Sequence, residues 1–316
     1  EFTNLPNTIS VYGDSYTFCD GVPVADAWPT LLEPVVGCGV INFGVGGYGT
    51  DQALMRLEKM HPAVPSTTVL LCIQPENINR VVSVYRGFYQ SNFGPPKPFY
   101  TVNDGALELH APFNSPERVR QLLLGDREEF LQIVRGHDRW YGEMETFGSP
   151  WEIQFPFSLQ LAFRAPFMWS RLHIAMTDIP SHAHLYQENG EAFGIMKAIV
   201  RRFVELGTQQ DFKPVVLILP PPRDVSRYSS TGDLNYQPLI AFLREQKVQF
   251  HDMMPTFSNA TDLYSLYVSR SGHYSRKGNE IIARELGAFL REHGAIPSLP
   301  APVNHSPAPD AALTPG

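Results

Sequence analysis

Short apolar runs rich in β-branched residues recur along the chain, separated by Gly, Pro and polar residues. They span 8–12, 39–43, 67–73, 214–219 and 248–251. Runs of this length without polar alternation are typical of strands buried on both faces, as in parallel sheets. The pattern therefore predicts a sheet of about five parallel strands.

Amphipathic helical patterns lie between or after these runs, at 26–36, 50–60, 190–207, 234–246 and 275–293. We expect Thr50 to cap the second of them. This alternation predicts a flavodoxin-like three-layer α/β/α sandwich. Ligands of such sheets bind beyond the carboxyl ends of the strands, so the residues that follow each strand are the first candidates for a site.

Residues 81–189 interrupt the alternation and are interpreted as an insertion. Seventeen aromatic residues fall within 85–169, a higher density than the 12% of the whole chain. Such a segment could be an accessory subdomain with its own aromatic core or a lid over a pocket, and the two are compatible. We therefore expect one α/β domain over 1–296, interrupted at 81–189, and a disordered Pro/Ala-rich tail over 297–316.

The composition of this 316-residue chain limits the classes of partner that it can bind. A net charge of −7 argues against a nucleic-acid or anionic-membrane partner, because both need a basic surface. No run of eighteen apolar residues occurs, so no membrane-spanning segment is predicted. The start at Glu1 is interpreted as a cloning remnant or a trimmed terminus, which leaves the compartment and the oligomeric state open. Cys19 and Cys38 could pair only in an oxidising compartment.

Gly13-Asp14-Ser15 follows the first predicted strand. Serine at the turn from a strand to a helix often caps the helix. The same position suits a nucleophile, because the hydroxyl lies at the carboxyl edge of the sheet and the Ser15 N–H points to where an oxyanion would form.

The loop after the second strand contains Gly44-x-Gly46-x-x-Gly49, the spacing of a dinucleotide fingerprint. The loop follows the second strand and not the first, and no acidic residue clearly ends the next strand, which weakens that interpretation. Alternatively, the loop presents the N–H of Gly47 to an anionic intermediate.

The third strand is followed by Asn77, either a turn residue or an oxyanion donor. His273 lies just before the last helix, which would pack beside the first strand and so place a base near Ser15.

Together these four places resemble the sequence blocks of the SGNH hydrolases, the GDSL esterase/lipase superfamily, over roughly 1–80 and 210–293. The resemblance implies that Ser15 is the nucleophile and His273 the base. It also implies an oxyanion hole formed by the N–H groups of Ser15 and Gly47 and the side chain of Asn77. The stretches "GVPVADAWPTLLE" and "KPFYTVNDGALEL" further resemble a subgroup associated with bacterial surface-polysaccharide metabolism, which implies a periplasmic or other extracytoplasmic location.

The family usually has an Asp three or two residues before the catalytic His, and here Arg270 and Ser271 occupy those positions. Two carboxylates at the predicted sheet edge, Glu76 and Asp252, are possible replacements for orienting His273. A Ser-His dyad without an acid is the alternative that we favour.

We expect a serine esterase that hydrolyses or transfers a short acyl group, such as an O-acetyl group on a carbohydrate, and that needs no cofactor. The alternatives are a non-catalytic carbohydrate-binding relative and a dinucleotide-binding protein. His173, His182 and His184 lack the spacing of a common zinc site and have no nearby acid in the sequence, so no metal is expected. Arg223, after the fourth strand, could contact substrate or lie in solvent.

Overall fold

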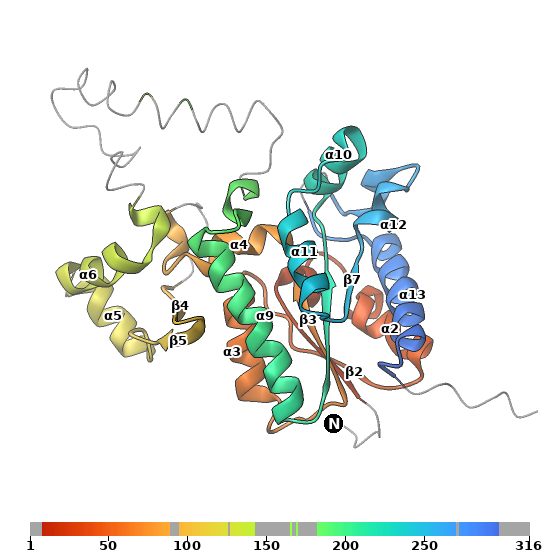
Figure 1. The fold of residues 1–316 in the computed structure, drawn as a ribbon, viewed down its shortest axis with the longest axis horizontal. Helices are drawn as coiled ribbons and strands as arrows, with labels where there is room; N and C mark the ends of the chain where they lie inside the picture. Colours follow the sequence, from red (N-terminus) through yellow and green to blue (C-terminus); the bar gives the residue numbers. More distant parts are fainter. Residues whose placement is uncertain are drawn as a thin grey trace, which may run out of the picture.

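A computed structural model describes residues 8–88, 95–125, 127–142, 165, 169, 182–269 and 272–296. Its centre is a five-stranded parallel sheet in the order β2-β1-β3-β6-β7 (Figure 1). The strands are β1 (Ile9–Tyr12), β2 (Val40–Asn42), β3 (Thr68–Ile73), β6 (Lys213–Ile218) and β7 (Phe250–Asp252). This is the flavodoxin-like order, so the predicted fold class is confirmed.

Helices cover both faces of the sheet (Figure 1). One face carries α2 (Trp28–Val36) and α13 (Arg276–Glu292), and the other carries α3 (Thr50–Met60), α9 (Glu191–Gln209) and α11 (Gln237–Glu245). In α13 the buried side chains Ile282, Leu286 and Leu290 recur every four residues and form one apolar face. Shorter helices and 3₁₀ turns complete the described part of the sandwich: α1 (Ser15–Phe18), η1 (Val24–Asp26), η2 (Pro75–Asn77), α4 (Ile78–Val81), η4 (Ala183–Tyr186), α10 (Pro222–Thr231), α12 (Met254–Ser258) and η5 (Leu263–Leu266).

All five predicted strands and all five predicted helices are present, with ends that differ by at most three residues. Two local expectations were wrong. Gly49 and not Thr50 is the N-cap of α3, and the side chain of Gln52, one turn on, accepts from the Gly49 N–H at 3.2 Å. The predicted strand 248–251 leaves Asp252 just beyond its end, but Asp252 is the last residue of β7, because its pairing with Ile218 extends the ladder by one position.

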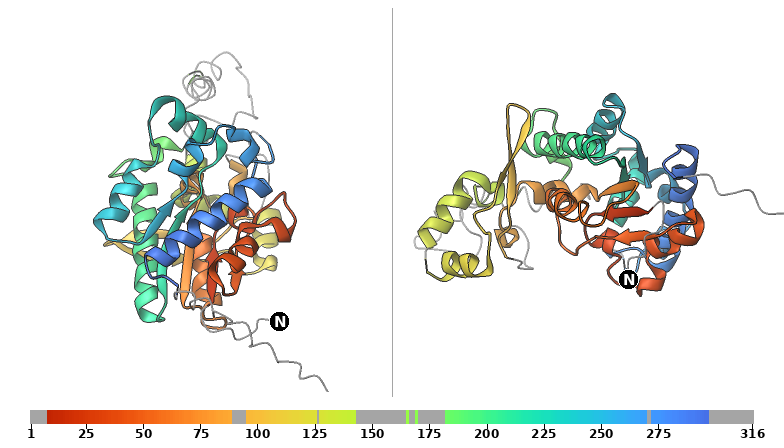
Figure 2. Two further views of the ribbon diagram at one scale, coloured as in Figure 1. Left: turned by 90° about the vertical axis from the view of Figure 1, so that its right-hand side faces the viewer. Right: turned by 90° about the horizontal axis from the view of Figure 1, so that it is seen from below.

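The described part of the insertion folds beside the sandwich. It contains the 3₁₀ turn η3 (Arg86–Phe88), the antiparallel hairpin β4 (Phe99–Asn103) and β5 (Ala106–His110), and helices α5 (Pro116–Leu124) and α6 (Arg127–His137). In the right-hand view of Figure 2 these elements project from one side of the sheet. A second apolar cluster lies there, and its buried members are Val84, Phe99, Phe113, Leu122, Phe130, Val134 and Tyr141.

Polar contacts attach the insertion to the α3 side of the sandwich. The ammonium of Lys97 pairs with Asp51 in the first turn of α3, and both side chains are buried. The hydroxyl of Tyr100 donates to Glu58 at 3.2 Å.

Residues 143–164, 166–168 and 170–181 lie outside the described residues, as does the predicted tail 297–316. The lid interpretation of the insertion therefore stays a prediction. Across the described parts of the chain, no helix combines the length and the apolar character that a membrane span requires.

Candidate active site

The turn after β1 places Ser15 at the start of α1. Only glycine fits at position 13, because a Cβ there would lie 2.1 Å from Thr17 Oγ1 and 2.9 Å from Cys72 Cβ. Asp14 is the N-cap, and its Oδ1 accepts from the Tyr16 N–H at 2.9 Å. Since Asp14 caps α1, the interpretation of Ser15 as the cap was wrong. The Ser15 hydroxyl instead contacts a histidine.

That contact is with His273, which lies 258 positions away in the sequence. The Ser15 Oγ and His273 Nε2 atoms are 2.7 Å apart. An isolated antiparallel bridge between Tyr267 and Tyr274 holds the loop that carries His273, just ahead of α13. A serine hydroxyl can donate to Nε2 only if that nitrogen is unprotonated, so the neutral imidazole that accepts this proton carries its own proton on Nδ1.

Two backbone N–H groups at this edge of the sheet are candidates for an oxyanion hole. Within the described ranges, no hydrogen-bond partner is found for the N–H of Ser15 or for that of Gly47. Gly47 has a φ of +83°, in the left-handed region that favours glycine. Its carbonyl oxygen accepts from Arg86 Nη1 at 2.9 Å, which fixes the orientation of the peptide that follows it.

Gly44 and Gly49 of this loop have structural roles. A Cβ at Gly44 would lie 2.5 Å from the Phe18 N atom, so glycine lets the loop approach the backbone of α1. Gly49 precedes α3 as its N-cap, whereas the third glycine of a dinucleotide fingerprint packs its helix against a strand. This geometry accounts for Gly44 and Gly49 without a bound dinucleotide.

Asn77, in η2, is 1% exposed and contacts the turn that carries Ser15. Its Nδ2 donates to Asp14 Oδ2 at 3.1 Å. A primary amide has two N–H groups, so one remains for an acyl oxygen after the Asp14 bond is made.

Arg80 joins three of the loops at this edge. Its Nη1 donates to the Tyr48 carbonyl at 2.7 Å and lies 3.5 Å from Asp14 Oδ2, and its Nη2 lies 3.5 Å from Glu76. Burial raises the pKa of Asp14, and the Arg80 charge opposes that rise. Sequence reasoning assigned no role to Asp14 or Arg80. The spacing of Glu76 and Arg80, four residues apart, was the one local signal.

Neither of the two predicted orienting acids contacts His273. Glu76 forms the ion pair with Arg80. Asp252 accepts from the Tyr236 hydroxyl at 3.0 Å and from the Met254 N–H at 2.9 Å. Among the residues that the structure describes, no carboxylate forms a hydrogen bond or ion pair with His273. Arg270 and Ser271 lie outside the described residues.

His182 has an acidic partner that the sequence did not reveal. Its Nε2 lies 3.1 Å from Asp224 Oδ2, and both side chains are buried. His173 lies outside the described residues. The described part of the chain contains no group of three His, Cys, Asp or Glu side chains that could hold a metal ion. Arg223 takes part in contacts within the chain.

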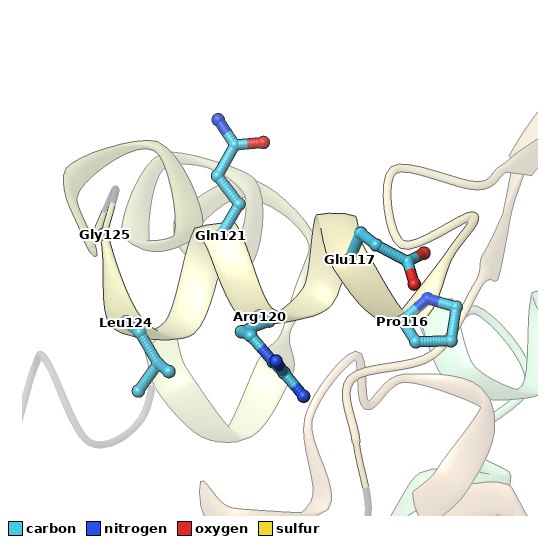
Figure 3. Close-up of a pocket in the computed structure, with 6 residues that line it drawn as sticks. All are labelled: Pro116, Glu117, Arg120, Gln121, Leu124 and Gly125. Atoms are coloured by element: carbon cyan, nitrogen blue, oxygen red, sulfur yellow. The ribbon is translucent and has the colours of Figure 1, made fainter.

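A separate hollow lies along α5 (Figure 3). Its lining residues are Pro116, Glu117, Arg120, Gln121, Leu124 and Gly125, which come from this helix and its C-cap. They include no nucleophile with an adjacent base. The Ser15 and His273 pair is therefore the candidate active site of the described chain.

The fold and this pair define a class: a flavodoxin-like α/β protein with a serine and a histidine at the carboxyl edge of the sheet. The sequence matches no family model and no curated protein. Solved structures similar to this chain include a lipase/acylhydrolase from Enterococcus faecalis, 14% identical over 94% of this chain and 100% of that one, with a TM-score of 0.43. A member of the lipolytic protein G-D-S-L family from Veillonella parvula is 12% identical over 91% and 97% of the two chains, with a TM-score of 0.42. The psychrotrophic esterase EstA from Pseudoalteromonas sp. is 15% identical over 91% and 98%, with a TM-score of 0.41.

Proposed function

We propose that the chain is a serine esterase of the SGNH type with Ser15 as nucleophile and His273 as general base. The observation that carries the proposal is the 2.7 Å contact between Ser15 Oγ and His273 Nε2. A serine hydroxyl is a weak nucleophile until an adjacent base accepts its proton. The contact supplies that base at the start of α1, where ligands of such sheets bind.

The reaction proceeds through an acyl-enzyme. His273 takes the proton of Ser15 while Oγ attacks the acyl carbonyl, and the negative charge that develops on the carbonyl oxygen is held by the N–H groups of Ser15 and Gly47 and by the Asn77 amide. The tetrahedral intermediate then expels the alcohol, which leaves with the proton from His273. A water molecule or a second hydroxyl compound then attacks the acyl-enzyme by the same route. Hydrolysis and acyl transfer therefore use the same residues.

For the substrate we propose a short acyl ester, specifically an O-acetyl group on a carbohydrate. The stretches that resemble a subgroup associated with bacterial surface-polysaccharide metabolism support this assignment. The acidic net charge fits a neutral substrate better than a polyanionic one.

Labelling with a fluorophosphonate probe tests the proposed nucleophile. The wild-type protein is expected to react at Ser15 and to release acetate from p-nitrophenyl acetate and from acetylated oligosaccharides. Ser15→Ala is expected to lose both reactions and to keep its unfolding transition, because only the hydroxyl is removed. Ser230→Ala, at an exposed serine of α10, is the control.

Retention of esterase activity in purified Ser15→Ala protein would refute the assignment of the nucleophile. Saturable binding of an acetylated oligosaccharide by a wild-type protein that neither labels nor hydrolyses would instead support the non-catalytic carbohydrate-binding alternative. A rise in thermal stability with NAD or NADP would favour the dinucleotide alternative.

A further inference from the structure

Tyr16 connects the turn that carries the nucleophile to the loop that carries the base. Its hydroxyl donates to the carbonyl of Gly272, the residue before His273, at 3.2 Å. Its ring lies against the imidazole, with 4.8 Å between the centroids and 58° between the planes. One side chain, adjacent in sequence to Ser15, therefore contacts both the base and the backbone next to it.

Tyr16 is itself held from several directions. Besides the N–H bond to Asp14, its carbonyl accepts from Trp28 Nε1 at 3.1 Å. The ring makes an edge contact with Tyr274, with 5.1 Å between the centroids, and the residue is 6% exposed. Because of these contacts the ring has little freedom to move, and it can act as a fixed support for its neighbour.

In a Ser-His-Asp triad the acid orients the imidazole and stabilises the imidazolium that forms when the serine proton is taken. We propose that Tyr16 is a positioning residue that takes over much of this work for His273. This inference rests on the proposed function. The hydroxyl bond anchors the loop at Gly272, and the ring restricts rotation of the imidazole.

The chemistry of the ring suits the charge that develops on His273. A cation that lies over the face of an aromatic ring, within about 6 Å of its centroid, is attracted by the ring quadrupole. In this proposal the imidazolium of His273 gains that attraction from the Tyr16 ring, whose centroid lies 4.8 Å from that of the imidazole. Burial raises the pKa of Tyr16 well above its usual value, so its hydroxyl keeps the proton that it donates to Gly272. The support is therefore weaker than a carboxylate but stays the same across the working pH range.

Two substitutions separate the hydroxyl from the ring. Tyr16→Phe removes only the donor, and a loss of about fivefold in kcat with an unchanged KM is expected for one hydrogen bond. Tyr16→Leu removes the ring as well, and a loss of about fiftyfold or more is expected when the imidazole loses its support. The rate of fluorophosphonate labelling is expected to follow the same order.

Tyr267→Phe is the matched control. Tyr267 is a buried tyrosine of the same loop, and its hydroxyl donates to the Pro220 carbonyl at 2.9 Å. Its bridge to Tyr274 is made by the backbone, so phenylalanine leaves that bridge in place. This variant is expected to keep the wild-type kcat. Hydrogen exchange is expected to rise at 272–275 in Tyr16→Phe and not in Tyr267→Phe.

The proposal is overturned if Tyr16→Phe and Tyr16→Leu keep the wild-type kcat or change only KM. It is also overturned if Tyr267→Phe lowers kcat as much as Tyr16→Phe does, since the effect would then be a general loss of stability. If Tyr16→Leu does not fold, the isosteric Tyr16→Phe decides the matter. If the wild-type protein neither labels nor hydrolyses esters, the proposed function fails, and unchanged exchange at 272–275 in Tyr16→Phe would still refute the anchor.

Discussion

Asp14 and Ser15 divide two tasks that one residue could not perform together. Asp14 caps α1 by accepting from the Tyr16 N–H, and it also accepts from the side chain of Asn77. Ser15 directs its hydroxyl to His273. Because the Asp14 carboxylate caps the helix, the Ser15 oxygen is left in contact with the His273 imidazole. The same carboxylate also holds Asn77, the proposed oxyanion donor.

Asn77 gives the first prediction at the scale of single residues. Asn77→Ala should lower kcat by about 10²- to 10³-fold with little change in KM, because it removes a donor that acts on the charge of the transition state. Asn79→Ala is the control: Asn79 is also buried, and its Nδ2 donates to the Glu76 carbonyl at 3.1 Å. Steady-state kinetics on both variants checks the difference. An effect of Asn77→Ala on KM alone would assign this residue to substrate binding.

The second prediction concerns the acid that would orient His273, because no carboxylate among the described residues contacts this histidine. Glu76→Gln and Asp252→Asn should each lower kcat by less than about tenfold, whereas loss of a true triad acid costs about 10⁴-fold. Both carboxylates have other partners, Arg80 and Tyr236 respectively. Turnover of p-nitrophenyl acetate by the folded variants is the measurement. A loss of several orders of magnitude in either variant would identify the relocated acid.

At the scale of elements, the loop after β2 and helix α1 are packed as one unit. Asn42 links them, since its Nδ2 donates to the Thr17 carbonyl at 2.9 Å and its Oδ1 accepts from the Gly44 N–H at 2.9 Å. The glycine at 44 allows the loop to approach α1 without a steric clash. The position of Gly47 relative to Ser15 therefore depends on this packing.

Gly44→Ala tests that dependence. The added Cβ would lie 2.5 Å from the Phe18 N atom, so the loop and α1 must separate. We expect a loss of about 1–3 kcal/mol in the free energy of unfolding. A fall in kcat of about tenfold or more is also expected, since small displacements of reacting groups are costly.

Gly194→Ala, within α9, is the matched control, because no atom lies within 4 Å of its added Cβ. It should raise stability by about 0.5–1 kcal/mol and leave kcat unchanged. Urea unfolding and steady-state kinetics are measured on both variants. Wild-type kcat in Gly44→Ala would show that the loop position is not critical.

At the scale of the whole molecule, several carboxylates are buried with the fold. Burial raises the pKa of Asp14 and of Asp138, and it raises the pKa of Asp252 to about 6. A carboxylate with a raised pKa binds its proton more tightly in the folded state than in the unfolded chain. The stability that this protonation contributes is present at low pH and is lost as the pH rises through the folded-state pKa.

Asp252→Asn isolates one of these contributions. Asparagine can still accept through Oδ1, the atom that accepts from both Tyr236 and Met254. The stability of the variant relative to wild type is expected to increase between pH 4 and pH 6, by about 1–3 kcal/mol, since each pKa unit corresponds to about 1.4 kcal/mol. Urea unfolding at several pH values checks this, with Asp211→Asn at an exposed carboxylate as control. A difference that does not change with pH would contradict the raised pKa.

The sequence by itself determined the elements and the positions of the candidate groups. Apolar runs such as 67–73 and the four-residue spacing in α13 are local patterns, and local burial preferences select strand or helix from them. Once the parallel order was inferred, the residues after each strand had to meet at one edge. The sequence therefore predicted that Ser15, Gly47, Asn77 and His273 lie at that edge, and the structure brings the Ser15 and His273 side chains into contact there.

Only the tertiary structure decided which groups bond to each other at that edge. Asp14 and not Ser15 caps α1, and Arg80 connects three loops. Asp252 accepts a hydrogen bond from Tyr236 and does not contact His273. The contact of Tyr16 with the His273 loop joins residues more than 250 positions apart, and no local spacing encodes it. The physical reason is that hydrogen-bond partners of buried side chains depend on distances and angles of a few tenths of an ångström, which packing of the whole chain sets and periodicity does not.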